Sequence, residues 1–340
     1  MSSTLTILLP SLLALLHYHI GITEAQLDIG VNYGMAGDSL PSPATVVQLF
    51  KKYRIQKVRL LEPNSDVLEA LEDSGIDVTL GIKNEDLPSI ASNATAAERW
   101  FNNHVEPYIP VINFQYITAG NEVVPGDLAQ YVLPAMQNIQ NIINSYEYDG
   151  LRVSTVVGTA TLGSLDPPSS GAFADEARAD MVGIINFLSN TSSPLLVNVY
   201  PYFAFASDPN HVRLDYVQFT ATSPLVQDGK LSYSNMLDAI VDAFYWAMEK
   251  EGVSYVDAVV SESGWPSDGG GLWATPQLAK TYNQHFVKKF LAKQATPKRP
   301  DRYLEGFIYT MFNENQKPSG VDQHWGLFYP DGTPVYPLFS

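Results

Sequence analysis

Residues 258–266, Ala-Val-Val-Ser-Glu-Ser-Gly-Trp-Pro, begin as an apolar, β-branched run and end in residues that terminate a strand. A short, nearly continuous apolar run is typical of a strand covered on both faces, as in a parallel sheet. Similar runs recur from residue 26 onward and predict eight strands: residues 28–33, 57–61, 77–82, 115–119, 152–157, 195–200, 258–261 and 306–311. The first stretch is therefore one unit of a repeating pattern.

Stretches of helical periodicity separate the predicted strands. Ser42-Pro43 and Thr275-Pro276 each resemble an N-cap followed by proline in the first helical turn. Two apolar stripes at helical spacing predict helices packed on a core: Tyr233, Met236, Leu237, Ile240, Val241, Phe244 and Met248, and then Tyr282, Phe286 and Phe290. This α/β alternation predicts a single (β/α)8 (TIM) barrel over residues 26–340, with an open doubly wound sheet as the alternative.

The composition excludes several classes of function. The chain of 340 residues has a formal net charge of −16, which disfavours nucleic acids and anionic membranes as partners. It has no cysteine, so thiol nucleophiles and disulfides are excluded. The histidines after residue 25 are scattered without metal-ligand spacing, so neither a metal nor another cofactor is predicted: His104, His211, His285 and His324.

The first 25 residues differ from the rest of the chain. Residues 5–16 are mostly apolar, and Thr23-Glu24-Ala25 offers small residues at the −3 and −1 positions of a cleavage site. This pattern predicts a signal peptide over residues 1–25, and a membrane anchor is disfavoured because the run is too short to span a bilayer. Sequons at Asn93 and Asn190 fit a secreted glycoprotein. We expect the extracellular space or cell wall (apoplast) as its location, in preference to the vacuole.

Two glutamates directly follow predicted strands. Glu122 ends the fourth, in Gly-Asn-Glu, and Glu262 ends the seventh, in Ser-Glu-Ser. The long connections at residues 159–174, 203–229 and 264–273 are predicted as non-helical loops on the same face, where barrel enzymes build their sites. Strands four and seven are three places apart around a barrel, so the two carboxylates would face each other across its mouth. Cleavage of a glycosidic bond needs such a pair, although a single glutamate in this position is usually a solvated loop residue.

Five motifs, which occur in order along the chain, favour the interpretation of Glu122 and Glu262 as a catalytic pair. They are Ile-Gly-Val-Asn-Tyr-Gly at 29–34, Gly-Asn-Glu-Val at 120–123, Asn-Val-Tyr-Pro-Tyr-Phe at 198–203, Val-Ser-Glu-Ser-Gly-Trp-Pro-Ser at 260–267 and Phe-Asn-Glu-Asn-Gln-Lys at 312–317. With them, nearly the whole chain after residue 25 resembles the plant endo-β-1,3-glucanases of glycoside hydrolase family 17. That family has a (β/α)8 barrel and retains anomeric configuration.

The resemblance implies roles for the two glutamates. Glu262 would be the nucleophile that forms a covalent glycosyl-enzyme, and Glu122 the proton donor that later acts as base. Retention requires the carboxyl groups to be about 5–5.5 Å apart, so an ionised Glu262 should raise the pKa of Glu122. The implied activity is that of a secreted glucan endo-1,3-β-glucosidase, a carbohydrate-metabolising hydrolase of plant defence or of the cell wall. It would act as a monomer on callose, laminarin or fungal wall glucan.

Other residues are predicted to contact the sugar. Asn121 is placed to bond the 2-hydroxyl, and Tyr200 is either a partner of Glu262 or a core aromatic residue. Asn198, Glu314 and Lys317 match family positions near the sugar. Four aromatic residues are candidates for stacking on pyranose faces: Tyr33, Phe203, Trp265 and Phe312.

Two positions depart from the family pattern. Leu61 replaces a tyrosine that usually lies near the −1 sugar, and Asp322 stands where a glutamate is common. Loss of one hydrogen bond would slow catalysis, at a cost of about 1–3 kcal/mol, without abolishing it. Leu61 leaves open the alternative of a β-glucan-binding protein with weakened catalysis. A second alternative is a hydrolase of mixed-linkage β-1,3-1,4-glucan, which would share the same site and differ in the shape of its loops.

Overall fold

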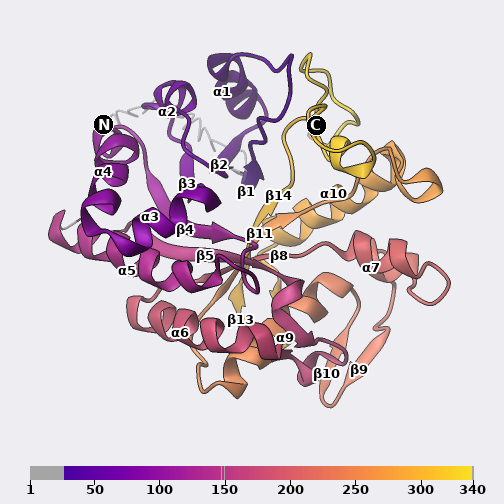
Figure 1. Ribbon diagram of the computed structural model, residues 1–340. Helices are drawn as coiled ribbons and strands as arrows, with labels where there is room; N and C mark the ends of the chain where they lie inside the picture. The colour runs from indigo at the N-terminus through magenta and orange to yellow at the C-terminus, as the bar shows by residue number, and fades with distance from the viewer. Residues whose placement is uncertain (1–26, 147, 149, 339–340) are drawn as a thin grey trace, which may run out of the picture.

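The computed structural model describes residues 27–146, 148 and 150–338, and the predicted signal peptide lies outside these residues. Eight parallel strands close into a barrel in the order β1-β14-β11-β8-β5-β4-β3-β2 (Figure 1). Their bounds are β1 (Leu27–Asn32), β2 (Ile55–Leu60), β3 (Asp77–Ile82), β4 (Phe114–Asn121), β5 (Arg152–Gly158), β8 (Leu195–Asn198), β11 (Ala258–Ser263) and β14 (Glu305–Ile308). The predicted barrel is confirmed, and the open sheet is excluded.

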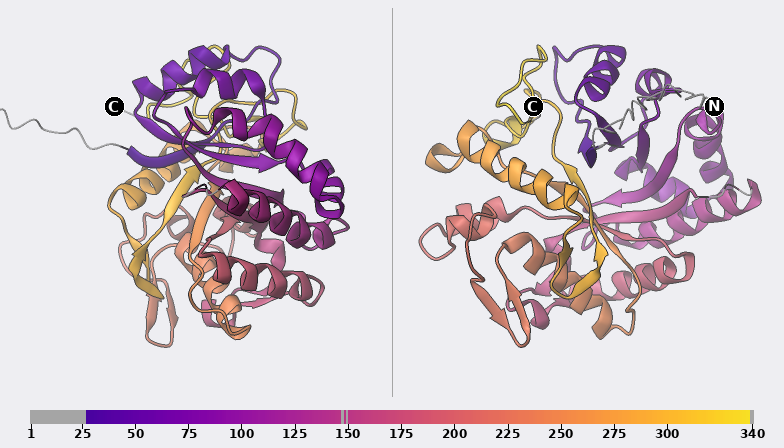
Figure 2. Two further views of the ribbon diagram at one scale, coloured as in Figure 1. Left: turned by 90° about the vertical axis from the view of Figure 1, so that its left-hand side faces the viewer. Right: turned by 180° about the vertical axis from the view of Figure 1, so that it is seen from behind.

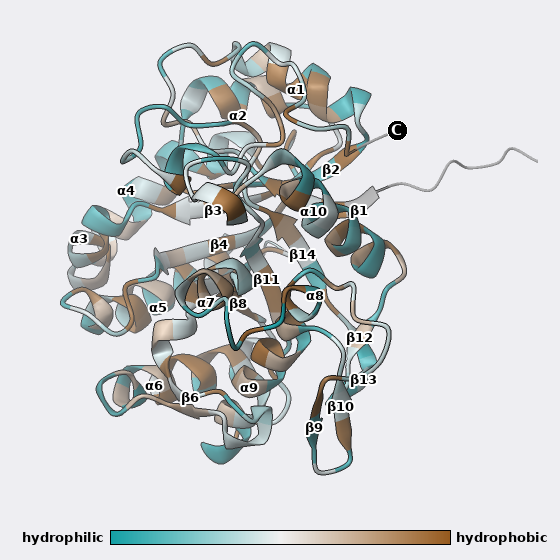
Figure 3. Cartoon of the chain, turned by 90° about the vertical axis from the view of Figure 1, so that its right-hand side faces the viewer, coloured by the Kyte–Doolittle hydropathy of each residue, from teal (hydrophilic) through white to brown (hydrophobic). Residues whose placement is uncertain are grey.

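Helices connect the barrel strands and surround them (Figure 2). The main ones are α1 (Pro43–Lys52), α2 (Ser65–Leu71), α3 (Leu87–Ser92), α4 (Ala94–His104), α5 (Ala129–Tyr146), α6 (Asp175–Thr191), α9 (Met236–Lys250) and α10 (Pro276–Leu291). Both predicted caps are confirmed: Ser42 accepts a hydrogen bond from the N–H of Thr45, and Thr275 from that of Leu278. Covered on both faces, β11 is buried along its whole length, and its first half, residues 258–260, is hydrophobic (Figure 3).

The region after β8 differs from the prediction. Residues 203–229 are not a non-helical loop, because α7 (Pro201–Ser207), α8 (Leu214–Val217) and the hairpin of β9 (Val226–Asp228) and β10 (Leu231–Tyr233) lie within or across it. Pro201 begins α7, and this helix buries Tyr202 and Phe205. Residues 159–174 contain a second small hairpin, β6 (Leu162–Ser164) and β7 (Ala172–Phe173). Elements of seven residues or fewer are too short to show a clear periodicity in the sequence.

The predicted stripe on α9 needs a correction. Tyr233 lies in β10, before the helix begins, and Met236 is only half-buried. The helix is buried on nearly all sides, and Asp238 and Asp242 are buried with the apolar residues. Asp238 is paired with the Nζ of Lys289 at 2.8 Å, and Asp242 accepts a hydrogen bond from the backbone N–H of Lys298 at 2.8 Å. These partners allow carboxylates to lie within a packed core.

Candidate active site

Glu122 and Glu262 lie at the carboxyl ends of β4 and β11. In the barrel order, β5 and β8 separate these strands, which places them three positions apart. Both side chains line one open cavity of about 270 Å³, together with Asn121, Tyr200 and Phe203. The cavity is at the end of the barrel where active sites of this fold are built.

The carboxylate of Glu262 is 6% exposed and has two strong partners. Arg59, on β2, forms an ion pair and hydrogen bond with Oε1 through its Nη1. The hydroxyl of Tyr200, the residue before α7, donates to Oε2 at 2.6 Å. The predicted contact between Tyr200 and Glu262 is therefore present. A guanidinium and a hydroxyl on the two oxygens stabilise a carboxylate anion in a buried place.

Glu122 has a different environment. Its Oε1 accepts a hydrogen bond from the Nδ2 of Asn198 at 2.9 Å. Burial is the main cause that raises the pKa of Glu122, and the negative charge of Glu262 adds to it, while Asn198 and Arg59 act in the opposite direction. Two carboxyl groups with unlike surroundings provide one proton donor and one anion at the same pH.

The backbone at Glu122 has an unusual conformation. Its φ is 55°, and Gly120, two residues before it, has φ 87°. Residues other than glycine rarely occupy this left-handed region, and such strain is concentrated at functional sites. The side chain of Asn84 fixes the peptide in between, because its Oδ1 accepts from the N–H of Asn121 at 2.9 Å and its Nδ2 donates to the carbonyl of Asn121 at 3.0 Å.

Arg59 joins the two strand ends, although it was not among the site residues predicted from the sequence. Its Nη2 donates to the Oδ1 of Asn121 at 2.8 Å, and its Nη1 donates to the Oδ1 of Asn32 at 2.9 Å as well as to Glu262. It is 0% exposed. An arginine between Val58 and Leu60 in an apolar strand was the available signal, since a buried charge requires a partner.

The aromatic candidates fall into two groups. Phe203, on α7, is 48% exposed and lines the cavity beside Glu122. Trp265 and Phe312 are 0% exposed and Tyr33 is 4% exposed, so none of the three offers a free face to a sugar. The prediction that they stack on pyranose rings is corrected: they pack in the core, where Tyr33 contacts Phe312 and Trp265 contacts other rings. Their apolar surface is equally suited to either place.

Lys317 lines the cavity, whereas Glu314 lies behind it. Glu314 is 2% exposed and accepts hydrogen bonds from the N–H of Ala36 at 2.9 Å and the hydroxyl of Tyr309 at 3.2 Å. Burial raises the pKa of Glu314 to about 7. Lys317 pairs with Glu314 at 3.2 Å and contacts the hydroxyl of Tyr309. The predicted direct contact between Glu314 and the sugar is therefore corrected. Glu314 lies behind the cavity wall and supports Lys317 and Tyr309.

The two departures from the family pattern both lie at the cavity. Leu61 lines it with an apolar side chain, and Asp322 lines it with a charged one. Leu61 brings a half-buried apolar side chain to the wall, where it can neither donate nor accept a hydrogen bond. Asp322 is exposed and near Lys317. Burial lowers the pKa of Lys317, and the negative charges of Glu262 and Asp322 oppose this effect.

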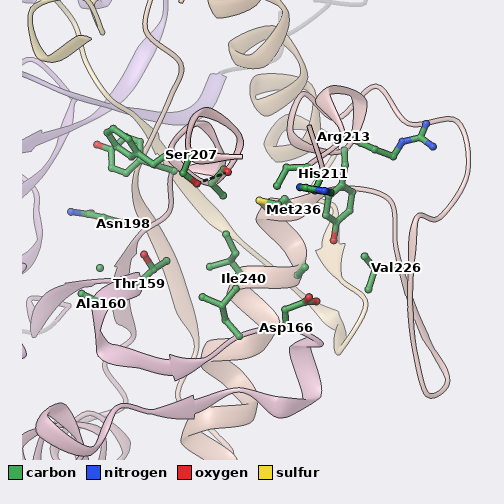
Figure 4. Close-up of a pocket in the computed structure, with 18 of the residues that line it drawn as sticks. Thr159, Ala160, Asp166, Asn198, Ser207, His211, Arg213, Val226, Met236 and Ile240 are labelled. Atoms are coloured by element: carbon green, nitrogen blue, oxygen red, sulfur yellow. Dashed lines mark hydrogen bonds between the residues drawn. The ribbon is translucent and has the colours of Figure 1, made fainter. Parts of the chain in front are cut away.

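A larger cavity, of about 840 Å³, adjoins this site and shares Glu122, Tyr200 and Phe203 with it. It extends from Asn198 to residues of the β9–β10 hairpin and α9, such as Val226 and Met236 (Figure 4). The two cavities together form a cleft with the carboxylates near its middle, as expected where a chain is cut between sugars bound on both sides.

Tyr200→Phe tests the support of Glu262. The variant keeps the ring but removes the hydroxyl that donates to Oε2 at 2.6 Å. We expect kcat/KM on a β-glucan to fall about 10- to 100-fold, because a charge-assisted hydrogen bond to the nucleophile is lost while Arg59 remains. Tyr202→Phe, a neighbouring change on α7, should keep wild-type kinetics. Equal losses in both variants would contradict a specific role for the Tyr200 hydroxyl.

Within residues 27–146, 148 and 150–338, no group of three or more His, Asp or Glu side chains is arranged to hold a metal ion.

In the same part of the chain, none of the helices is both long and apolar enough to cross a bilayer.

Comparisons with known proteins agree with this geometry. A family model described as glycosyl hydrolases family 17 matches residues 29–339. A probable glucan endo-1,3-beta-glucosidase of Arabidopsis thaliana, BG4, is 48% identical over 321 residues, covering 94% of this chain and 93% of the relative. Lichenase-2 of Hordeum vulgare is 44% identical over 310 residues, covering 91% and 97%.

Solved structures give the same result. One from a study of two plant β-glucan endohydrolases with distinct substrate specificities has a TM-score of 0.88 at 43% identity, over 92% of this chain and 100% of that one. CJP38, a β-1,3-glucanase and allergen of Cryptomeria japonica pollen, has a TM-score of 0.87 at 44% identity, over 92% and 99%.

Proposed function

The chain belongs to glycosyl hydrolases family 17, and from that premise we propose that it hydrolyses internal β-1,3-glucosidic bonds of β-glucans with retention of configuration. The observation that carries the proposal is the pair of strand-end glutamates in unlike surroundings. Glu262 is an anion held by Arg59 and Tyr200, and Glu122 has a raised pKa beside it. This is the combination that double displacement requires.

In the first step, Glu262 attacks the anomeric carbon of the sugar in the smaller cavity. Glu122 donates its proton to the glycosidic oxygen, so that the rest of the glucan leaves on the side of the larger cavity. As Glu262 loses its negative charge to the new ester bond, one cause of the raised pKa of Glu122 disappears. Glu122 is then suited to accept a proton from water in the second step, which releases the sugar and restores Glu262.

Asn121 and Phe203 are proposed to bind the substrate directly. The Oδ1 of Asn121 accepts hydrogen bonds from Arg59 at 2.8 Å and from Asn198 at 3.4 Å. Its amide nitrogen is thereby turned towards the cavity as a donor for a sugar hydroxyl. The exposed ring of Phe203 lies where both cavities meet, and offers an apolar platform for the sugar next to the cleaved bond. Asn198 and Lys317 complete the polar wall.

The substrate is tested by reducing-sugar release from laminarin and from mixed-linkage β-1,3-1,4-glucan, measured side by side. We expect release from laminarin to be at least about tenfold faster. Glu262→Gln, prepared in the same way, controls for contaminating hydrolases. Faster release from the mixed-linkage polymer would favour the alternative suggested by the similarity to Lichenase-2. Binding of laminarin without release would favour a glucan-binding protein.

We further propose that the enzyme is a secreted monomer of the extracellular space or cell wall. The support is the sequence of residues 1–25, which ends in Thr-Glu-Ala before Gln26. N-terminal sequencing of protein from the culture medium of a plant cell line should begin at residue 26. Retention in the cell with an intact N-terminus would contradict secretion.

A further inference from the structure

The larger cavity changes in character along its length. Near Glu122 it is lined by polar side chains, such as Asn198 and Thr159. At its other end, six apolar side chains form what we call the apolar chamber: Leu165, Val212, Leu225, Val226, Met236 and Ile240. Figure 4 shows Met236, Ile240 and Val226 at this end, away from Asn198.

The chamber is built from four separate segments of the chain. Leu165 comes from the connection after β5, Val212 from the turn before α8, Val226 from β9 and Met236 from the start of α9. Four of the six side chains are only half-buried and Leu165 is 36% exposed. Apolar surface left open inside a cleft is costly in water, and it commonly marks a place where an apolar group binds.

A glucan does not suit these walls. Glucose units carry hydroxyl groups around the ring edge, and each hydroxyl taken from water needs a new hydrogen-bond partner. Three polar or charged groups lie at the rim: Arg213 is paired with Asp215 at 2.6 Å, His211 with Asp208 at 2.8 Å, and the exposed Asp166 lies at the same end of the cavity as Val226 (Figure 4). Among the described residues, the buried hydroxyl of Tyr216, which also lines the cavity, has no hydrogen-bond partner. That hydroxyl is covered rather than open to the cavity, so apolar walls with polar groups only at their rim fit a ligand with an apolar body and few polar atoms.

We propose that the apolar chamber binds the alkyl or aryl part of an alcohol or phenol joined to, or about to be joined to, the sugar next to the cleaved bond. The inference rests on the proposed function, because the chamber lies beyond Glu122, on the side where the leaving group departs. The same group can occupy it as the aglycone of a β-glucoside or as the acceptor of a glucosyl unit.

The acceptor reaction uses no further reagent. The alcohol oxygen attacks the anomeric carbon of the glycosyl ester on Glu262, and its proton passes to the carboxylate of Glu122. The bond between the anomeric carbon and Glu262 breaks, and the electron pair returns to the Glu262 carboxylate. The products are an alkyl or aryl β-glycoside and the free enzyme, with water replaced by the alcohol as the incoming group.

Calorimetry with methyl, butyl and hexyl β-glucosides tests the binding directly. Burial of each added methylene should tighten binding about threefold, so butyl β-glucoside should bind roughly 30-fold more tightly than the methyl compound. The heat capacity change should become more negative along the series. Equal affinity within about twofold from methyl to hexyl, or no detectable binding of the hexyl compound, would overturn the proposal.

Near-isosteric variants locate the effect. Val212→Thr/Val226→Thr places hydroxyls in the chamber, whereas Val287→Thr/Val335→Thr changes two other half-buried valines outside it. The first pair should reduce the butyl-to-methyl ratio to below about fivefold, and the second should leave the ratio at its wild-type value. An equal reduction of the butyl-to-methyl ratio in both double variants would mean that the alkyl group does not bind in the chamber, and would also overturn the proposal.

Transfer during laminarin digestion gives a second readout. With ethanol, butanol and hexanol at equal concentrations, the ratio of alkyl glycoside to free sugar should rise about threefold per methylene, and the rise should be smaller in Val212→Thr/Val226→Thr. A ratio independent of alcohol length would count against the chamber. Reducing-sugar release from laminarin in the absence of alcohol reports separately on the proposed function, so a failure of either can be told from a failure of the other.

Discussion

Glu262→Ala is expected to lose at least about 10⁴-fold in kcat on laminarin while the protein remains folded. The reason is that no other carboxylate is placed to form the covalent intermediate, since Glu122 is committed to proton transfer. Arg59 loses its ionic partner, but its Nη1 and Nη2 keep the amide oxygens of Asn32 and Asn121. Circular dichroism and thermal unfolding should therefore report a folded protein, and near-normal turnover would remove Glu262 from its assigned role.

A small external nucleophile makes this test sharper. In Glu262→Ala the space of the missing carboxylate admits azide, which can attack an aryl β-glycoside with a good leaving group from the side that Glu262 occupied. Activity should return, with an α-glycosyl azide as product, because a single displacement inverts configuration. In Glu122→Ala, azide should instead give the β-glycosyl azide, since Glu262 still forms the ester first. A β product from Glu262→Ala would reverse the assignment of the two glutamates.

Glu122→Gln is expected to lower kcat/KM on laminarin by about 10²- to 10⁴-fold, the usual contribution of a general acid. The amide preserves the size of the side chain and can still face Asn198. On an aryl glycoside whose leaving group needs no proton, formation of the glycosyl-enzyme should be much less affected. A similar loss on both substrates would indicate damage to the site as a whole.

The pH dependence of kcat/KM should differ between the wild-type enzyme and the same variant, and the direction of the difference can be predicted. Burial and the charge of Glu262 raise the pKa of Glu122, so this group keeps its proton to higher pH than a free glutamic acid. The protonated form is the active one in the first step. In the wild-type enzyme kcat/KM should accordingly fall as pH rises through that pKa, and in Glu122→Gln the fall should be absent. If kcat/KM of Glu122→Gln still fell at high pH as in the wild type, the fall would have to come from the titration of another group.

Much of the fold could be predicted because its signals are local. Each barrel strand is a short apolar run, and the caps at Ser42 and Thr275 mark helix starts within four residues of sequence. The strand ends are less accurate. The eighth was predicted to reach Met311, but β14 ends at Ile308. Tyr309 and Met311 still donate to the last residues of the neighbouring strands, Ser263 and Asn32, whereas the N–H of Thr310 donates to the carbonyl of Trp325, outside the barrel. Such contacts depend on distant segments.

The site was predictable only in part for the same reason. Glu122 and Glu262 stood out because a glutamate at the end of an apolar strand is unusual, and their strand numbers placed them face to face. Whether an aromatic ring is open or covered is decided by what packs on it, so Trp265 and Phe203 looked alike in the sequence. Arg59 escaped notice because its three partners come from β1, β4 and β11.

The closing strand pair of the barrel also sets the order in which this molecule can be made. Val31 on β1 pairs with Ile308 on β14, and the side-chain amide of Asn32 donates to the carbonyl of Ile308, 276 residues later. At a ribosomal rate of roughly 5–20 residues per second, the first strand waits about 15–55 s for its neighbour to be synthesised. During that interval one side of the nascent sheet stays open. Asn32 and Arg59 are partners on the adjacent strands β1 and β2, but Arg59 lacks Glu262 until β11 has been made. Closure of the barrel therefore requires translation of β14, and β1 keeps one unpaired edge until then.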